Sequence, residues 1–220
     1  MITIEKLSLL PRANYEIGLG SDPINYYFWP VLGDLYRKRV EIALNECAGG
    51  ESILEVGYGS GVAFLNLSKK YKFIFGVDTS AVPDLVAAVF SQYGISPNLH
   101  KGCITNLAMF ESNSFDTVFA ISILEHLKSD QLESALKEIS RVLKPGGQLV
   151  YGVPVDRKMM TVAFSLLGHN IKNIHFSSYK EIEKAVRVVF ESGMIINMAS
   201  WIPFVGPIYQ VGNFKKAVEI

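Results

Sequence analysis

Short apolar segments alternate with helical patterns through the middle of the chain, and this alternation limits the fold more than any other feature. Four segments rich in Val, Ile and Phe are each followed by a turn or helix signal: residues 52–56, 73–77, 115–121 and 147–153. Such segments are typical of strands buried on both faces, and strands that alternate with helices form parallel sheets. The sequence therefore predicts an α/β fold with a doubly wound, mostly parallel sheet.

Two helices of this pattern have clear start signals. The first is predicted to begin with Asp130 as its cap, because Glu133 follows three residues later, and to stop before Pro145. The second is predicted to begin at Ser178, with Glu181 in the same relation. Each carries one apolar face, so both are expected to pack on the sheet. A further helix is expected over residues 32–44.

Residues 192–214 contain no charged side chain and are long enough to cross a bilayer as a helix. The glycines and prolines within this segment instead favour two strands, 194–202 and 208–214, around a Pro-Gly turn. We therefore expect a hairpin and no transmembrane span. The turn at residues 201–204 is apolar, and it would either contact a membrane surface or a second subunit, or belong to an ordinary buried hairpin.

The composition bounds the size and partners of the protein. The chain has 220 residues, of which 49% are hydrophobic, and this is enough for one globular domain spanning 1–220. Within it we expect a helical lid at 1–45, a cofactor-binding core at 52–155, a lid-like insertion at 156–175, and a final helix and hairpin at 176–220. A net charge of zero argues against nucleic acid as the main partner.

The cysteines and the first residues suggest a cellular location. Cys47 and Cys103 are too few for a disulfide framework, and neither has the spacing typical of a zinc site. The first twelve residues lack a basic segment followed by a long apolar one, so they do not resemble a signal peptide. We expect a cytoplasmic protein.

A strand running into a glycine-rich turn is the clearest functional motif. Residues 53–61 are Ile-Leu-Glu-Val-Gly-Tyr-Gly-Ser-Gly, and a helix is expected to open near Val62. Such a turn lets the backbone approach an anionic or nucleotide-like ligand closely. Asp78 ends the next apolar segment, where a carboxylate accepts hydrogen bonds from ribose hydroxyls. The third glycine, Gly61, does not fit G-x-G-x-x-G, which disfavours NAD and FAD.

Several motifs appear together in a fixed order: Glu-Val-Gly-x-Gly-x-Gly at 55–61, Asp78, Phe-Asp-Thr-Val at 115–118, Leu-Glu-His-Leu at 124–127 and Leu-Lys-Pro-Gly-Gly at 143–147. This set resembles the class I S-adenosylmethionine-dependent methyltransferases, most closely over residues 52–151 and in the branch that acts on small molecules and lipids. The resemblance implies a Rossmann-like sheet of seven strands with an antiparallel C-terminal hairpin and helices on both faces. It also implies S-adenosyl-L-methionine as the cofactor.

The resemblance assigns roles by position. Three glycines would line the methionine part of the cofactor, Glu55 would support their turn, and Asp78 would hold the ribose. Where many members carry an acidic residue for the adenine amino group, this chain has Cys103; adenine would then rely on the backbone near Ile104, or else Cys103 is a small buried filler. The implied cofactor-binding residues are Tyr27, Glu55, Gly57, Tyr58, Gly59, Gly61, Asp78, Thr79, Cys103, Ile104 and Ser122.

His126 is the predicted general base, for use if the acceptor is protonated. The alternative is a structural residue at a helix start. The Asn/Asp-Pro-Pro-Tyr/Phe pattern of enzymes that methylate nucleobase amino groups is absent after residue 121, so a nucleobase acceptor is not expected. Metal-dependent methylation would need a convergent set of acidic ligands, and we expect no metal site.

Two apolar segments, 26–31 and 159–167, are predicted lids. Four side chains in or near them would either cover the pocket or only pack under a lid: Tyr26, Tyr27, His169 and His175. Such a pocket favours a hydrophobic or amphiphilic small molecule, such as a lipid, a quinone or a polyketide-like compound. Two other functions stay open. One is a protein of the same fold that binds the cofactor without turnover, and the other is a nicotinamide oxidoreductase.

Overall fold

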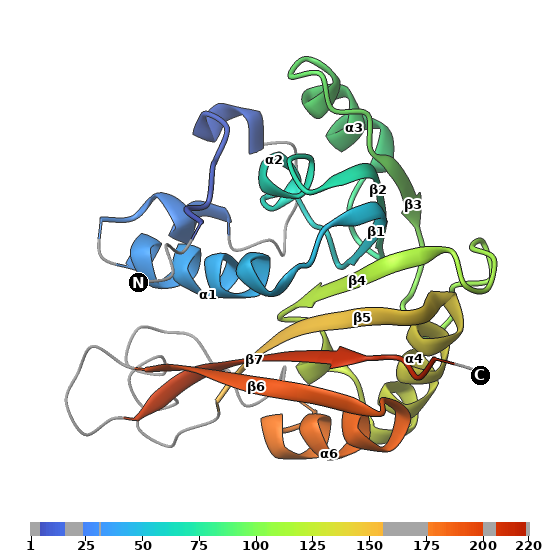
Figure 1. The fold of residues 1–220 in the computed structure, drawn as a ribbon. Coiled ribbons are helices and arrows are strands. Elements are labelled where there is room, and N and C mark those ends of the chain that lie inside the picture. The colour runs from blue at the N-terminus through green and yellow to red at the C-terminus, as the bar shows by residue number, and fades with distance from the viewer. Residues whose placement is uncertain (1–4, 16–23, 31, 156–175, 200–205, 219–220) are drawn as a thin grey trace.

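The computed structural model describes residues 5–15, 24–30, 32–155, 176–199 and 206–218. Within these ranges, seven strands form one sheet in the order β3-β2-β1-β4-β5-β7-β6 (Figure 1). The strands are β1 Gly50–Val56, β2 Tyr71–Asp78, β3 Asn98–Lys101, β4 Phe115–Ile121, β5 Leu143–Pro154, β6 Ser192–Ala199 and β7 Pro207–Lys215. The four apolar segments of the sequence are thus confirmed as strands β1, β2, β4 and β5.

The directions of the strands confirm the predicted sheet. Strands β3, β2, β1, β4 and β5 are parallel to one another. Strand β7 runs antiparallel to both β5 and β6 and lies between them. The predicted C-terminal hairpin is therefore confirmed as β6 and β7, although residues 200–205 of its turn lie outside the described residues.

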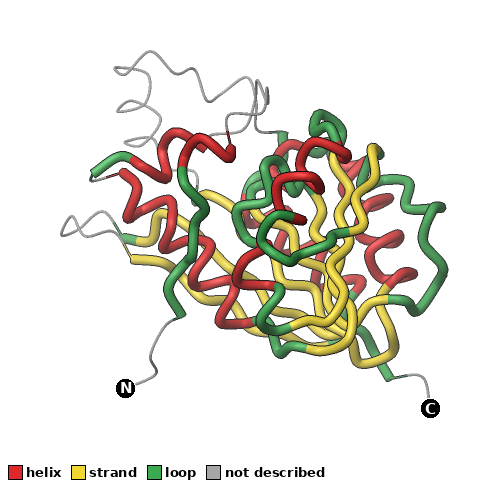
Figure 2. Tube along the Cα trace, turned by 90° about the horizontal axis from the view of Figure 1, so that it is seen from above, coloured by secondary structure: helices red, strands yellow, loops and turns green. Residues whose placement is uncertain are grey.

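Helices cover both faces of the sheet, as Figure 2 shows from above. The helices are α1 Leu32–Glu46, α2 Phe64–Leu67, α3 Pro83–Ser91, α4 Ser129–Val142 and α6 Tyr179–Val189, with shorter 3-10 helices η1 Arg12–Tyr15, η2 Ile24–Phe28 and η3 Leu124–His126. Apolar residues of α1, α2 and α3 form one core with one side of the sheet. Those of α4 and α6 form a second core with the other side. The doubly wound, Rossmann-like architecture is confirmed.

The start of one helix differs from the sequence prediction. Helix α6 is capped by Ser178 as predicted, and Glu181 completes the capping box. Helix α4 instead begins at Ser129, because the chain is extended at Lys128 and the side chain of Gln131 accepts a hydrogen bond from the Lys128 amide at 3.0 Å. Asp130 lies in the first turn and is not the cap. Gln131, three residues after Lys128, thus plays the part that was predicted for Glu133, three residues after Asp130.

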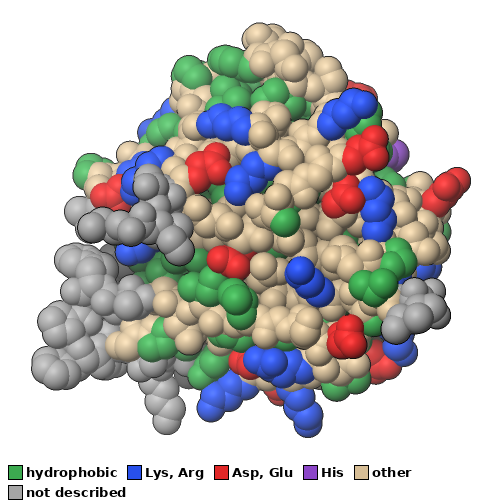
Figure 3. Space-filling view, viewed as in Figure 1, with side chains coloured by type: hydrophobic (Ala, Val, Ile, Leu, Met, Phe, Trp, Pro, Cys, Tyr) green, Lys and Arg blue, Asp and Glu red, His purple; other side chains and the backbone are tan. Residues whose placement is uncertain are grey.

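Helix α2, after the glycine turn, is only one turn long. None of the described helices combines the length and apolar character needed to cross a bilayer. On the face that Figure 3 shows, positive and negative side chains are interspersed rather than gathered by sign.

Candidate active site

The carboxyl ends of the parallel strands meet at one edge of the sheet. Strand β1 lies between β2 and β4, so the chain direction of the connections reverses at β1. In open α/β sheets, ligands bind at this reversal point. The glycine loop, residues 57–61, follows β1, Asp78 ends β2, and Ser122 follows β4, so the fold brings three predicted site segments to one place.

The glycine loop adopts a backbone that other residues avoid. Gly57, Gly59 and Gly61 have φ values of 71°, 52° and 77°. A Cβ atom on Gly57 would lie 2.0 Å from Cδ1 of Ile123, the residue after Ser122. The loop is therefore built for close approach, and its first glycine packs directly against the segment that follows β4.

Asp78 holds this loop in place. Its Oδ2 accepts a hydrogen bond from the Gly59 amide at 3.0 Å, and its Oδ1 accepts from the amides of Ser80 and Ala81 at 2.7 and 2.9 Å. Since a carboxylate offers roughly four acceptor positions, these three bonds leave room on Oδ2 for a ligand hydroxyl. The geometry fits a ribose at the end of β2.

Tyr58, in the same loop, has a buried hydroxyl that a ligand could satisfy. Its side chain is buried, and its hydroxyl has no hydrogen-bond partner within the described part of the chain. Burial raises the pKa of Tyr58, and the charges of Asp78 and Asp84 raise it further, so the hydroxyl is a neutral donor. S-adenosylmethionine has hydroxyl and carboxylate groups. It would therefore satisfy both the buried donor, Tyr58, and the acceptor with spare capacity, Asp78.

On the other side of the loop lies a polar group that we call the arginine cluster, formed by Tyr27 (η2), Tyr36 and Arg39 (α1), Ser122 and Tyr209 (β7). Arg39 donates hydrogen bonds to the hydroxyl oxygens of Tyr27 at 3.1 Å and Ser122 at 3.2 Å. Its guanidinium carbon lies 4.2 Å from the centroid of the Tyr36 ring. The hydroxyls of Ser122 and Tyr209 are 2.9 Å apart. Residues distant in the sequence thus share one polar centre.

The backbone at Ser122 is strained to make this arrangement. Ser122 has a φ of 56°, a conformation that non-glycine residues rarely adopt, and its amide donates to the Gly152 carbonyl at 2.7 Å. A Cβ atom on Gly152 would come within 2.7 Å of the Tyr209 ring, so the glycine makes room for that phenol. Strain of this kind is concentrated at functional sites.

Sequence reasoning placed Tyr27 and Ser122 at the site but missed Arg39 and Tyr209. A weak signal for Arg39 existed, because Tyr36, Arg39 and Ala43 share the inward face of the predicted helix by their spacing. No local pattern connects Tyr209 with Ser122, which is 87 positions away.

The middle of the chain is similar to known proteins. Residues 54–151 match the family model described as "Methyltransferase domain". Over this segment, which we call the methyltransferase domain, the chain is similar to S-adenosylmethionine-dependent methyltransferases. A relative named "Ubiquinone biosynthesis O-methyltransferase" from Hahella chejuensis is 28% identical over 120 residues, which are 54% of this chain and 49% of that protein. The chain thus spans about half the length of the curated relatives it matches.

Solved structures share the fold of this methyltransferase domain at low identity. The N-methyltransferase NodS from Bradyrhizobium japonicum, in complex with S-adenosyl-L-homocysteine, covers 89% of this chain and 92% of its own, with a TM-score of 0.64 and 16% identity. The [4+2]-cyclase SpnF covers 83% of this chain and 81% of its own, with a TM-score of 0.66 and 18% identity. Because one of these is described as a cyclase, the fold alone does not decide the reaction.

The other predicted cofactor residues lie around the glycine loop of the methyltransferase domain. Glu55 is buried in β1, and Ile104 is buried after β3. Thr79 is exposed beside Asp78. Cys103 is exposed, and its sulfur accepts a hydrogen bond from the Thr105 hydroxyl at 3.1 Å. The alternative of Cys103 as a buried filler is therefore wrong, while its part in adenine binding stays a prediction.

His126 lies in η3, with an exposed side chain, and its amide donates to the Ile123 carbonyl at 3.1 Å. Its role as a base stays a prediction. Residues 159–167, His169, His175 and the turn 201–204 lie outside the described residues. Within the described ranges, no group of three or more His, Cys, Asp or Glu side chains is arranged to hold a metal ion.

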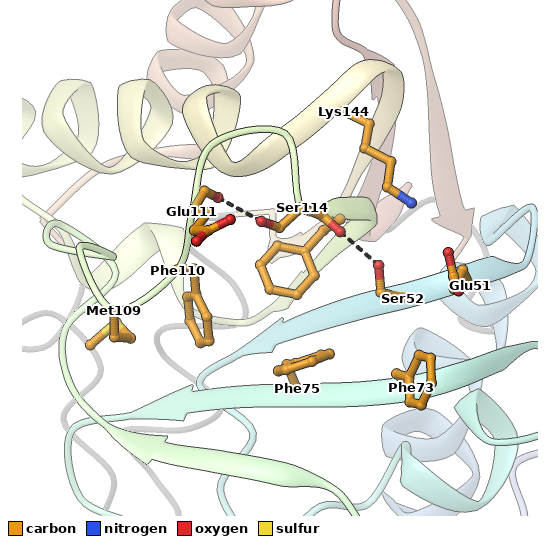
Figure 4. A pocket seen from close by; sticks show the side chains of 10 residues that line it. Glu51, Ser52, Phe73, Phe75, Met109, Phe110, Glu111, Ser114 and Lys144 are labelled. Atoms are coloured by element: carbon orange, nitrogen blue, oxygen red, sulfur yellow. Dashed lines mark hydrogen bonds between the residues drawn. The ribbon is translucent and has the colours of Figure 1, made fainter.

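A cavity of about 390 Å³ lies at the opposite, amino edge of the sheet (Figure 4). Ser52, Phe73 and Lys144 line it from the first residues of their strands. Ser52 donates a hydrogen bond to the Ser114 carbonyl at 2.8 Å. The cavity is far from the glycine loop in the topology of the sheet, so it is not part of the candidate active site.

Proposed function

We propose that this chain transfers a methyl group from S-adenosylmethionine to a small hydrophobic or amphiphilic acceptor. The observation that carries the proposal is the glycine loop held by Asp78 at the carboxyl edge of a methyltransferase domain. The names of the curated relatives support a quinone-like or phenolic acceptor and an oxygen as the methylated atom. The neutral net charge, and the interspersed charges on the face that Figure 3 shows, argue against nucleic acid.

The residues of the chain would act mainly by holding and desolvating the reactants. S-adenosylmethionine supplies a methyl group on a positively charged sulfur, which is already a good leaving group. The loop amides, Tyr58 and Asp78 would fix the nucleoside and the methionine part. Tyr27, Tyr36 and Tyr209 would form an aromatic wall for the acceptor, which excludes water and aligns the reacting atoms. His126 would accept a proton from an acceptor that binds in its protonated form.

The first test is a calorimetric titration with S-adenosylmethionine, S-adenosylhomocysteine and NAD in parallel. We expect micromolar binding of the two sulfur nucleosides and much weaker binding of NAD. Methyl transfer is then measured as S-adenosylhomocysteine released in the presence of phenols, catechols and quinols. If neither sulfur nucleoside binds, the proposed function is wrong.

A second function is favoured by the turn after β3. Cys103 stands where many members carry a carboxylate, and the sequence shows no evident catalytic group, so a protein that binds the cofactor without turnover is the second candidate. Micromolar binding of both sulfur nucleosides, with no methyl transfer to any acceptor of the screen, would support this second function over the first.

A further inference from the structure

Arg39 carries a charge for which the described residues offer no carboxylate. Among the described residues, its guanidinium donates hydrogen bonds to the hydroxyls of Tyr27 and Ser122, and its Nε is shielded from solvent without an acceptor. Arg37, two positions earlier on the same helix, pairs with Asp34 instead. Since an ion in a partly buried site is stabilised chiefly by an opposite charge, the arginine cluster is electrostatically incomplete.

The neighbours of Arg39 do not supply the missing negative charge. Burial by itself lowers the pKa of Arg39, but the phenols of Tyr27 and Tyr209 more than offset this, and its pKa lies above the usual value. Burial raises the pKa values of Tyr36 and Tyr209, so these phenols are neutral at physiological pH. The charge of Glu125 also raises the pKa of Tyr209, but its carboxylate is not among the groups that raise the pKa of Arg39. The cluster is a net cation.

The cluster lies on the acceptor side of the methyltransferase domain. Asp78 would hold the nucleoside over β2, on one side of the glycine loop. Ser122 follows β4 and Tyr209 belongs to β7, and both strands lie on the opposite side of β1 from β2. Ile123, the neighbour of Ser122, touches the position of a Cβ on Gly57, so the cluster adjoins the loop. A group bound to Arg39 is therefore next to the methionine end of the cofactor and away from its nucleoside.

We propose that the acceptor binds as an anion, with a negatively charged oxygen paired with Arg39 and flanked by the hydroxyls of Tyr27, Ser122 and Tyr209. The inference rests on the proposed function. The charged oxygen belongs either to an ionised phenol or enol or to a carboxylate, and both present the same chemistry to a planar guanidinium, which binds such oxygens through its N–H fork. An acceptor that enters already ionised at the reacting oxygen needs no general base, which removes the need for His126.

The inference is tested with 4-nitrophenol and benzoate as probes on protein saturated with S-adenosylhomocysteine. The ionised form of 4-nitrophenol absorbs visible light, so the spectrum reports its protonation state when bound. We expect the wild-type protein to lower the apparent pKa of bound 4-nitrophenol by about one unit or more, as an opposite charge at close range does. Benzoate tests the carboxylate arm, and a preference for one probe tells which kind of oxygen the site takes.

Three variants make the test specific. Arg39→Met should abolish the shift of the 4-nitrophenol spectrum and weaken the probe that binds wild type by about tenfold or more. Arg39→Lys, which keeps the charge without the fork, should retain part of the effect and serves if Arg39→Met fails to fold. Lys38→Met removes one charge from an exposed position of the same helix and should behave as wild type.

Two results would overturn the inference. One is equal probe binding by wild type and Arg39→Met. The other is a loss of affinity for S-adenosylhomocysteine in Arg39→Met while probe binding is unchanged. If the affinity for 5′-methylthioadenosine, which lacks the carboxylate, is also unchanged, Arg39 holds the cofactor carboxylate. If the wild-type protein does not bind S-adenosylhomocysteine, the proposed function is contradicted. Probe binding is then measured in cofactor-free protein, where a dependence on Arg39 would still support the anion site.

Discussion

The two edges of the sheet use their charged groups differently. At the amino edge, Asp116 accepts hydrogen bonds from Lys144 at 2.8 Å and from the amides of Glu51 and Ser52 at 2.9 and 2.8 Å, so a charge on one strand is matched by groups on its neighbours. At the carboxyl edge, Arg39 has no carboxylate partner among the described residues. Charges at the amino edge thus tie strands together, while those at the carboxyl edge keep capacity for a ligand.

The largest expected effect concerns the backbone of the glycine loop. Gly61→Ala places a methyl group at a φ of 77° and within 2.6 to 2.7 Å of the Phe64 and Phe90 rings. Strain and overpacking together should lower the free energy of unfolding by roughly 2–5 kcal/mol. Gly94→Ala is the matched control, because Gly94 has a φ of 75° with nothing within 4 Å; strain alone should cost about 1–2 kcal/mol.

Both free energies of unfolding are measured by urea denaturation. Equal losses in the two variants would show that the loop is not closely packed, and the carboxyl edge would then differ less from an ordinary turn than the structure indicates.

Asp78→Ala should weaken cofactor binding at the carboxyl edge and also lower stability, because the same carboxylate accepts hydrogen bonds from three backbone amides. Loss of the ribose acceptor is expected to weaken S-adenosylhomocysteine binding by roughly 10- to 150-fold, since a hydrogen bond to a charged group contributes roughly 1.5–3 kcal/mol. Calorimetry measures the affinity. Asp84→Ala removes an exposed acidic residue of α3 nearby and should change it little. Unchanged affinity in Asp78→Ala would refute the assignment of the nucleoside site.

Asp116→Ala should lower stability at the amino edge without weakening cofactor binding. Loss of three hydrogen bonds is expected to lower the free energy of unfolding by roughly 1–3 kcal/mol at pH 7, with unchanged affinity for S-adenosylhomocysteine. Burial opposes ionisation of Asp116, but the hydrogen bonds from Lys144 and from the backbone outweigh it, and its pKa is lowered. The stabilisation is therefore complete above the unfolded pKa of about 3.9 and is lost as the pH falls through the lower folded pKa.

Thermal melts of wild type and Asp116→Ala across this pH range give the difference. A difference that grows as the pH falls would contradict the role of the ionised carboxylate.

Tyr209→Phe should have the smallest effect. It removes one hydroxyl from the arginine cluster and leaves the ring over Gly152 in place. Since a neutral hydrogen bond contributes about 0.5–1.5 kcal/mol, KM for the acceptor should rise by roughly three- to tenfold while cofactor affinity stays constant. Tyr93→Phe, at an exposed tyrosine outside the cluster, is the control. A changed cofactor affinity in Tyr209→Phe would place the cluster on the donor side instead.

The cofactor-binding half of the site, which we call the donor half, was predictable because each of its segments directly follows a strand in the sequence. Gly57 to Gly61 and Asp78 each stand directly after a strand that hydrophobicity identifies, and parallel strands bring their ends together. The meeting of Ser122 with Tyr209 and Arg39 in the arginine cluster was not predictable, because Tyr209 reaches Ser122 only through the order of β4, β5 and β7 in the sheet. Sequence patterns give no pairing partner for an antiparallel strand that returns from a distant segment.

The fold itself was largely predictable, with errors at boundaries. Buried strands and amphipathic helices follow from residue periodicity, and the Ser178 cap follows from its Glu181 partner. The cap of α4 was misplaced by two positions because the side chain of Gln131 performs the role expected of Glu133. Where two start signals of equal strength lie within one turn, the direction of the incoming chain decides at which residue the helix begins.

The position of β7 also orders events during synthesis. Residues 209–215 pair with 148–154 of β5, so β5 has an open edge until this late segment leaves the ribosome. An open strand edge is prone to pair with other chains. Strands β1, β2 and β3 are complete by residue 101, and β4 covers the other edge of β1 by residue 121, long before β7. Arrival of β7 closes the edge of β5 and delivers Tyr209 in the same event, so a nascent chain can acquire its acceptor site only once its sheet is protected.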